Sequence, residues 1–188
     1  MKILVVGPSW VGDMMMSQSL YRTLRARYPQ AIIDVMAPAW CRPLLSRMPE
    51  VNEAIPMPLG HGALAIGERR KLGHSLRERR YDRAYVLPNS FKSALVPFFA
   101  NIPLRTGWRG EMRYGLLNDA RVLDKDAWPL MVERYVALAY DNGVMRCAKD
   151  LPQPLLWPQL QVNEGEKSQA CSAFNLSNDR PIVGFCPG

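Results

Sequence analysis

Short apolar runs alternate with amphipathic segments along the first 150 residues of this chain. Lys2–Val6 is a β-branched, apolar run typical of a strand buried on both faces, and a Gly-Pro-Ser turn follows it. In the next segment Met16, Leu20 and Leu24 recur at helical spacing until a proline ends the pattern. This opening therefore predicts a strand, a loop and a helix.

The same alternation repeats several times after the first unit. We expect further strands at Ala31–Met36, Asn52–Ile55, Arg83–Leu87 and Leu104–Gly107, and helices at Cys41–Met48, within Leu64–Arg80, at Phe91–Ala100 and at Trp128–Asn142. Strands separated by helices indicate right-handed crossovers and a parallel sheet covered on both faces. The predicted fold of residues 1–150 is therefore an α/β, Rossmann-like doubly wound parallel sheet.

The remaining 38 residues differ in character. Residues 151–160 hold three prolines and predict an extended linker. Beyond it, Glu164–Phe174 predicts a helix and Arg180–Cys186 predicts a buried strand, which runs into Pro187 and Gly188. A strand at that position is where a second α/β unit would start, so we expect residues 161–188 to be the beginning of a truncated second domain.

Composition excludes several classes of protein. The longest apolar stretches, such as Ala94–Ala100, are far below the ~20 residues of a membrane span, and the first residues lack the pattern of a secretory signal, so we expect a cytoplasmic protein. The four cysteines are scattered and there are two histidines. This pattern predicts no metal site and no disulfide framework. We also expect no cofactor.

The basic charge suggests an anionic partner. The net charge is +7, and 22 of the 24 Lys and Arg residues lie in the first 150 residues. Nucleic acid, a phosphorylated small molecule or an anionic membrane surface would each suit this balance. Against a nucleic-acid-binding module, no RRM, KH or helix-turn-helix signature is present. A nucleotide-dependent oxidoreductase would require a glycine fingerprint that the first loop lacks.

The first strand-to-helix loop is the best candidate for chemistry. Gly12 and Asp13 stand where this loop enters the helix, and loops at the carboxyl ends of parallel strands face the ligand crevice. The helix dipole favours an ionised Asp13, which is then a candidate general base. Two plainer interpretations remain open: Asp13 is only an N-cap, and Gly12 only permits a tight turn.

Basic residues form two further candidate groups. Arg69, Arg70 and Lys71 lie on a helix after Gly60-His61-Gly62, where they form either a solvated face or a contact for anions. The second group follows the fourth and fifth predicted strands, on the expected ligand edge, where arginine suits bidentate capture of phosphate or carboxylate. Its members are Asn89, Lys92, Arg105, Arg109 and Arg113.

Four motifs in combination carry a family resemblance. They are MKILVV with its following loop and Gly12-Asp13, LPNSFKSA at 87–94, RTGWR at 105–109 and IVGFCPG at 182–188. Together they resemble the ADP-heptose:lipopolysaccharide heptosyltransferases of glycosyltransferase family 9, over essentially the whole chain.

This resemblance implies the amino-terminal, acceptor-side half of a two-domain GT-B enzyme. The donor would be held mainly by the other half, in a loop that begins at Gly188, so this chain alone is expected to be inactive. The implied reaction is inverting transfer of L-glycero-D-manno-heptose from ADP-heptose to the first heptose of the lipopolysaccharide inner core, heptosyl-Kdo2-lipid A. Another family member, with another acceptor, is the alternative.

The resemblance also assigns roles to residues. Asp13 matches the proposed catalytic base of the family. The acceptor-binding residues expected from their position and charge are Gly12, Arg69, Arg70, Lys71, Asn89, Lys92, Arg109 and Arg113. The lipid acceptor implies peripheral contact with the inner face of the cytoplasmic membrane, and no nucleic acid partner is expected.

Overall fold

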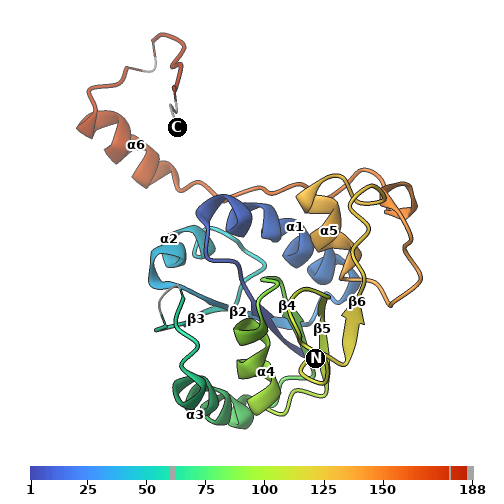
Figure 1. The fold of residues 1–188 in the computed structure, drawn as a ribbon. Helices are drawn as coiled ribbons and strands as arrows, with labels where there is room; N and C mark the ends of the chain where they lie inside the picture. Colours follow the sequence, from blue (N-terminus) through green and yellow to red (C-terminus); the bar gives the residue numbers. More distant parts are fainter. Residues whose placement is uncertain (60–61, 178, 186–188) are drawn as a thin grey trace.

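The computed structural model describes residues 1–59, 62–177 and 179–185. Six strands form one parallel sheet (Figure 1). They are β1 (Lys2–Val6), β2 (Ile32–Ala37), β3 (Glu53–Pro56), β4 (Arg83–Val86), β5 (Leu104–Trp108) and β6 (Asp119–Arg121). The strand order is β3-β2-β1-β4-β5-β6, and every pairing is parallel. The predicted doubly wound α/β sheet is confirmed.

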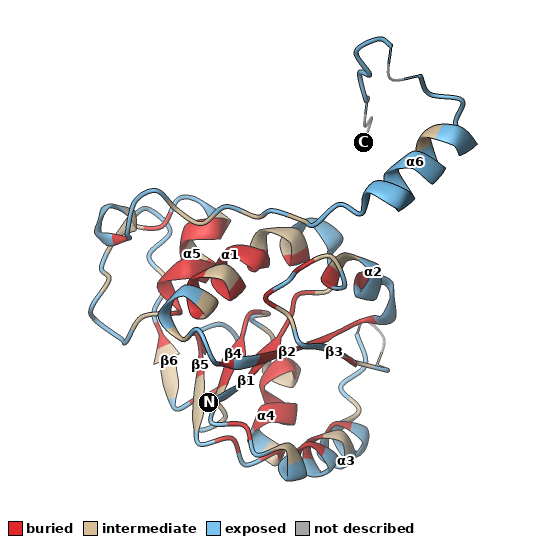
Figure 2. Ribbon diagram, turned by 180° about the vertical axis from the view of Figure 1, so that it is seen from behind, coloured by how far each residue is buried: buried red, intermediate tan, exposed pale blue. Residues whose placement is uncertain are grey.

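Helices cover both faces of the sheet (Figure 2). They are α1 (Val11–Arg27), α2 (Arg42–Leu45), α3 (Ile66–Leu76), α4 (Leu95–Phe99), α5 (Met131–Ala137) and α6 (Glu164–Ala173), with short 3-10 turns at Ala39–Cys41, Arg77–Arg79, Phe91–Ala94 and Ala148–Asp150. Helices α1, α2 and α5 lie on one face, and α3 and α4 lie on the other.

The apolar run of β1 explains why both faces are covered. Successive side chains of a strand point to opposite faces. Ile3 and Val5 belong to the core beneath α1 and α5, whereas Leu4 and Val6 belong to the core beneath α3 and α4. All four side chains are almost completely buried. The first strand therefore lies between two separate hydrophobic cores.

The position of β1 also creates the ligand edge. The chain runs outward from β1 to β3, then crosses back to place β4 on the other side of β1. Adjacent strands whose connections leave in opposite directions open a crevice at their carboxyl ends, which is where doubly wound sheets bind ligands. The loops after β1 and β4 are therefore the segments that face a ligand.

Several predicted elements differ from the structure. Strand β6 was not predicted, because three residues of sequence Asp-Ala-Arg contain no apolar run. The helix predicted at Trp128–Asn142 is shorter, because α5 ends at Ala137 and Trp128 packs in the core before the helix starts. The helices predicted at Cys41–Met48 and Phe91–Ala100 are partly 3-10 turns.

The strand predicted at Arg180–Cys186 is wrong for the part that the structure describes. Residues 179–185 contain no strand, and Ile182, Val183 and Phe185 are exposed. No described strand lies beside this segment, so its backbone groups have no ladder to join. Cys186 and Gly188 lie outside the described residues, as do Gly60 and His61.

The linker predicted at residues 151–160 lies along α1 without helix or strand. Buried Gln18 pairs with both backbone groups of Gln159, at 2.8 and 2.9 Å, and Arg22 donates to the Trp157 carbonyl. Helix α6 then projects away from the sheet (Figure 1). Among the described residues, no helix is long and apolar enough to cross a membrane.

Candidate functional site

The largest feature of the ligand edge is a cavity of about 530 Å³ between the loops after β1 and β4. Three groups of residues line it: the β1 loop and the start of α1, the β4 loop, and the segment from the end of β5 to α5. They are Pro8, Ser9, Trp10 and Asp13, then Leu87, Pro88, Asn89, Ser90 and Lys92, then Trp108, Leu123, Lys125, Met131, Arg134 and Tyr135. We call this space the main cavity.

Asp13 lies on the wall of the main cavity as the third residue of α1. Trp10 is the N-cap of this helix, which excludes the interpretation of Asp13 as the N-cap. Within residues 1–59, 62–177 and 179–185, no hydrogen bond or ion pair of the half-buried Asp13 carboxylate is found. The helix N-terminus favours its negative charge. This carboxylate can therefore accept a proton from a ligand.

Tyr135 of α5 lies near Asp13 in the same cavity. Burial, and secondly the charge of Asp13, raise the pKa of the Tyr135 phenol. Its hydroxyl therefore remains protonated at neutral pH and can donate a hydrogen bond.

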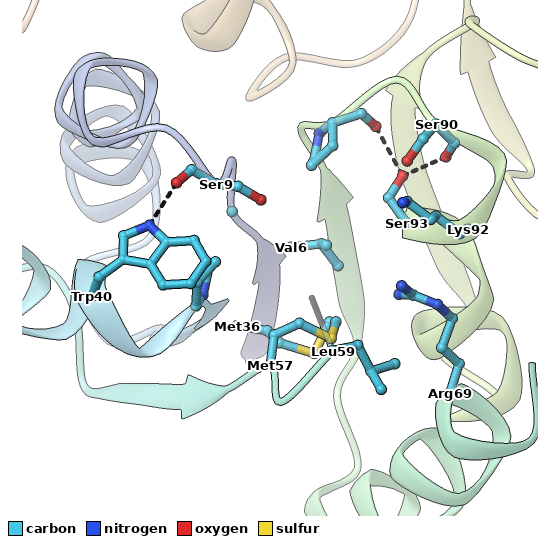
Figure 3. A pocket seen from close by; sticks show the side chains of 13 residues that line it. Val6, Ser9, Met36, Trp40, Met57, Leu59, Arg69, Ser90, Lys92 and Ser93 are labelled. Atoms are coloured by element: carbon cyan, nitrogen blue, oxygen red, sulfur yellow. Dashed lines mark hydrogen bonds between the residues drawn. The ribbon is translucent and has the colours of Figure 1, made fainter. Parts of the chain in front are cut away.

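A smaller cavity of about 80 Å³ adjoins the main cavity on the α3 and α4 side of the sheet (Figure 3). Ser9, Ser90 and Lys92 line both cavities. Figure 3 shows the Arg69 guanidinium and Lys92 on one side of the smaller space, with Ser9 and Trp40 on the other. None of its described lining residues is acidic. Apolar side chains of Val6, Met36, Met57 and Leu59 also line it. The smaller cavity is therefore a mixed space of small-anion size, with two cations and three serines among its lining residues.

Arg69 is fixed in place before any ligand binds. Its side chain is 4% exposed, and it donates to the carbonyls of Leu64 at 2.8 Å and Ala63 at 3.1 Å. Burial lowers the pKa of this guanidinium below its ordinary value. An arginine held by carbonyls rather than by a carboxylate keeps its charge available to an anion.

The structure brings together some of the predicted site residues and separates others. Asp13, Asn89 and Lys92 meet in the main cavity, and Arg69 joins Lys92 in the smaller one. The rest line neither cavity: Gly12, Arg70, Lys71 and Arg109 are exposed, and Arg113 is buried. Arg105, grouped with the residues expected after the fifth strand, lies inside β5 near its amino end, because both the predicted strand at Leu104–Gly107 and β5 itself include it.

Sequence reasoning missed Lys125, Arg134 and Tyr135, which line the main cavity. More than a hundred residues separate them from Asp13 along the chain. The sequence predicted only a helix in this region, and no local signal marks its first turns as facing a ligand. Packing of α5 beside α1 brings Arg134 and Tyr135 to the site, and Lys125 reaches it from the segment before α5. In the described part of the chain, no cluster of three or more potential metal ligands is found.

Across the described ranges, the Asp13 carboxylate has no hydrogen bond or ion pair, and a basic subsite adjoins it at the switch point of the parallel sheet. These features define the site of an α/β ligand-binding or catalytic domain. The model of glycosyltransferase family 9 (heptosyltransferase) matches residues 69–188. The chain belongs to this family, which confirms the resemblance found in the sequence.

Individual relatives are close. The chain is 90% identical over 188 residues to lipopolysaccharide heptosyltransferase 2 of Salmonella typhimurium, and 57% identical over 192 residues to lipooligosaccharide heptosyltransferase 2 of Haemophilus influenzae. In both comparisons all of this chain aligns with 54% of the relative, so the chain spans about half the length of these curated relatives.

Solved structures agree with the sequence comparisons. All of this chain matches 55% of the E. coli ADP-heptose lps heptosyltransferase II structure, with a TM-score of 0.91 and 84% identity. The matching part is the amino-terminal half of that GT-B protein. A family 9 glycosyl transferase from Veillonella parvula shares the fold, with a TM-score of 0.73 at 16% identity, over 94% of this chain and 50% of that one.

Proposed function

We propose that this chain is the acceptor-side half of an inverting glycosyltransferase that moves L-glycero-D-manno-heptose from ADP-heptose to the first heptose of the lipopolysaccharide inner core. The observation that carries the proposal is the Asp13 carboxylate, which faces the main cavity without a partner in the described part of the chain. The names of its close relatives support the donor and the kind of acceptor.

In the proposed reaction, Asp13 acts as the general base. A hydroxyl of the acceptor heptose lies in the main cavity and gives its proton to Asp13 as its oxygen attacks the anomeric carbon. The bond from that carbon to the ADP leaving group breaks on the opposite face, so the configuration inverts. The donor is held mainly by the carboxyl-terminal half. A single displacement needs no nucleophilic side chain on the enzyme. A general base is sufficient, and the Asp13 carboxylate can take that role.

The basic residues are proposed to hold the anionic part of the acceptor. Arg69 and Lys92 converge on the smaller cavity, where a carboxylate of an acidic core sugar or a phosphate would find two cations and several hydroxyls. The exposed candidates extend this surface without lining either cavity. They are Gly12, Arg70, Lys71 and Arg109.

The lipid anchor of the acceptor leads us to propose that the enzyme works at the cytoplasmic face of the inner membrane, in peripheral contact with it. The net charge of +7 supports this arrangement, because basic proteins are attracted to anionic lipid surfaces. Several arginines nevertheless use their guanidinium groups to hold the backbone of the fold. Arg25, Arg69 and Arg105 each donate to two or more backbone carbonyls, which argues against the alternative of an extended nucleic-acid surface.

The test is transfer from ADP-heptose to heptosyl-Kdo2-lipid A by a full-length protein that carries Asp13→Asn. The amide keeps the shape of the side chain but cannot accept the proton, so turnover should fall by roughly 10²- to 10⁴-fold. Glu78→Gln is the matched control, because Glu78 is an exposed carboxylate in the turn after α3 and lines neither cavity. An Asp13→Asn enzyme with more than about a tenth of wild-type turnover would contradict the base role.

A further inference from the structure

The β4 loop, defined here as residues 88–93, presents Asn89 and Lys92 to the main cavity. Part of its shape comes from within, because the Ser93 hydroxyl donates to the carbonyls of Ser90 at 2.6 Å and Pro88 at 3.0 Å (Figure 3). A half-buried loop held by only two such bonds would still have freedom to move. The structure adds a second set of contacts from the chain after β5.

Arg113 makes most of these contacts. Its side chain is 1% exposed, and one of its terminal nitrogens donates to the Pro88 carbonyl at 2.7 Å and to the Ser93 hydroxyl at 3.3 Å. The other terminal nitrogen donates to the Asn89 side chain at 3.4 Å and to the Trp108 carbonyl. A single guanidinium therefore joins both ends of the β4 loop to the end of β5.

Arg113 has no ion pair within the described part of the chain. Burial lowers its pKa to about 10, and the charge of Glu111 opposes this shift. The side chain is therefore a cation at neutral pH. Backbone carbonyl, amide and hydroxyl oxygens hydrogen-bond it, and the Glu111 carboxylate supports its charge through electrostatics. Burying a charge is costly unless it is hydrogen-bonded, so the positions of these oxygens and of the guanidinium depend on one another.

Two neighbours of Arg113 contact the same loop. The Glu111 backbone N–H donates to the Asn89 carbonyl at 3.2 Å, and the Glu111 carboxylate accepts from the Phe91 backbone N–H at 2.7 Å. Gly110 packs so closely that an added Cβ would lie 2.3 Å from the Asn89 carbonyl oxygen. Residues 110–113 thus contact the β4 loop at Pro88, Asn89, Phe91 and Ser93.

We infer that Arg113 is a positioning residue, which acts on the acceptor through the β4 loop rather than by touching it. This inference rests on the proposed function, and it gives Arg113 a role different from the direct acceptor contact expected from the sequence. The fork of a guanidinium reaches four oxygens, three in the β4 loop and one at the end of β5, whereas the single ammonium of a lysine cannot. A lysine at this position would keep the positive charge but could not make these four hydrogen bonds at once.

The experiment measures kcat and both KM values of a full-length Arg113→Lys enzyme. The acceptor KM should rise on the order of tenfold, because misplacing a binding group by ~1 Å can cost up to 100-fold, while the donor KM stays unchanged. Glu111→Ala is the second variant. Glu111 is exposed, so this protein should fold, and loss of the Phe91 contact should raise the acceptor KM by a smaller factor.

Arg105→Lys is the matched control. Arg105 also donates to carbonyls, of Ile102, Gly115 and Leu116, but it lies near the amino end of β5, away from both cavities. A purely structural role of Arg113 predicts equal losses of thermal stability and of active enzyme in Arg113→Lys and Arg105→Lys, with unchanged KM values. That result, or an unchanged acceptor KM in Glu111→Ala, would overturn the inference. Asp13→Asn in the same assay reports on the proposed function separately, because it lowers kcat.

Discussion

Gly110→Ala is the smallest change that should displace the β4 loop. The new methyl group would lie 2.3 Å from the Asn89 carbonyl oxygen and 2.8 Å from the Asn89 Cβ. Gly110 has no positive φ, so the backbone itself accepts alanine. The whole effect of the substitution therefore comes from the collision with Asn89.

The size of the effect follows from these distances. Ordinary van der Waals contact begins at about 3.4 Å, so Asn89 or the Gly110 backbone must move by about 1 Å. Both atoms on the Asn89 side belong to or adjoin its backbone, so rotation of a flexible side chain cannot remove the collision. Overpacking of this kind costs about 1–3 kcal/mol in stability. The same displacement should raise the acceptor KM by roughly tenfold to 100-fold.

Two glycines on α3 provide matched controls. At Gly73 an added Cβ would lie 2.6 Å from the Phe99 Cβ and 2.8 Å from the Val96 carbonyl oxygen, where α3 crosses α4 far from the main cavity. Gly73→Ala should therefore lose stability to a similar extent with a smaller rise in acceptor KM than Gly110→Ala, because it collides with α4 rather than with the β4 loop, although α3 also carries Arg69. At Gly67 nothing lies within 4 Å. Gly67→Ala should gain about 0.5–1 kcal/mol, because alanine is the better helix former.

The assay combines thermal unfolding with initial-rate kinetics for both substrates in full-length proteins. Destabilisation of Gly110→Ala together with a selective rise in acceptor KM supports the displacement of the β4 loop. Similar kinetics in Gly110→Ala and Gly73→Ala would refute the reasoning, because the loss would then follow from stability alone.

Two other regions give predictions of their own. Gln18→Ala leaves the Gln159 backbone groups and Glu50 without their buried partner. The loss should lower the free energy of unfolding by about 1–3 kcal/mol and speed protease cleavage within residues 151–160. An unchanged cleavage rate would show that Gln18 does not hold the linker. Replacing Arg69, Arg70 and Lys71 together by alanine should raise the acceptor KM and weaken its salt dependence, with little change for the donor. If the acceptor KM is unchanged at low salt, Arg70 and Lys71 are only a solvated face, and the buried Arg69 only holds the backbone of Ala63 and Leu64.

The sequence by itself determined the order of the first five strands and the position of Asp13 after the first of them. The run Lys2–Val6 is apolar on both faces, which requires a central parallel strand, and Asp13 follows it in the loop that such a sheet directs toward ligands. These features depend on short windows of sequence, where burial leaves a periodic pattern. The family motifs lie within such windows too, so the resemblance was visible before the fold was known.

Only the tertiary structure decided which distant groups meet. Strand β6 forms because β5 supplies a pairing edge, although its three residues carry no apolar signal. Tyr135 reaches the main cavity because α5 packs beside α1. Arg113 was expected to bind the acceptor, yet oxygens from Pro88, Asn89 and Ser93, at least twenty residues away, accept hydrogen bonds from it. The physical reason is that local patterns record how deeply a segment is buried, whereas the partners of a buried charge are set by the convergence of segments far apart in the chain.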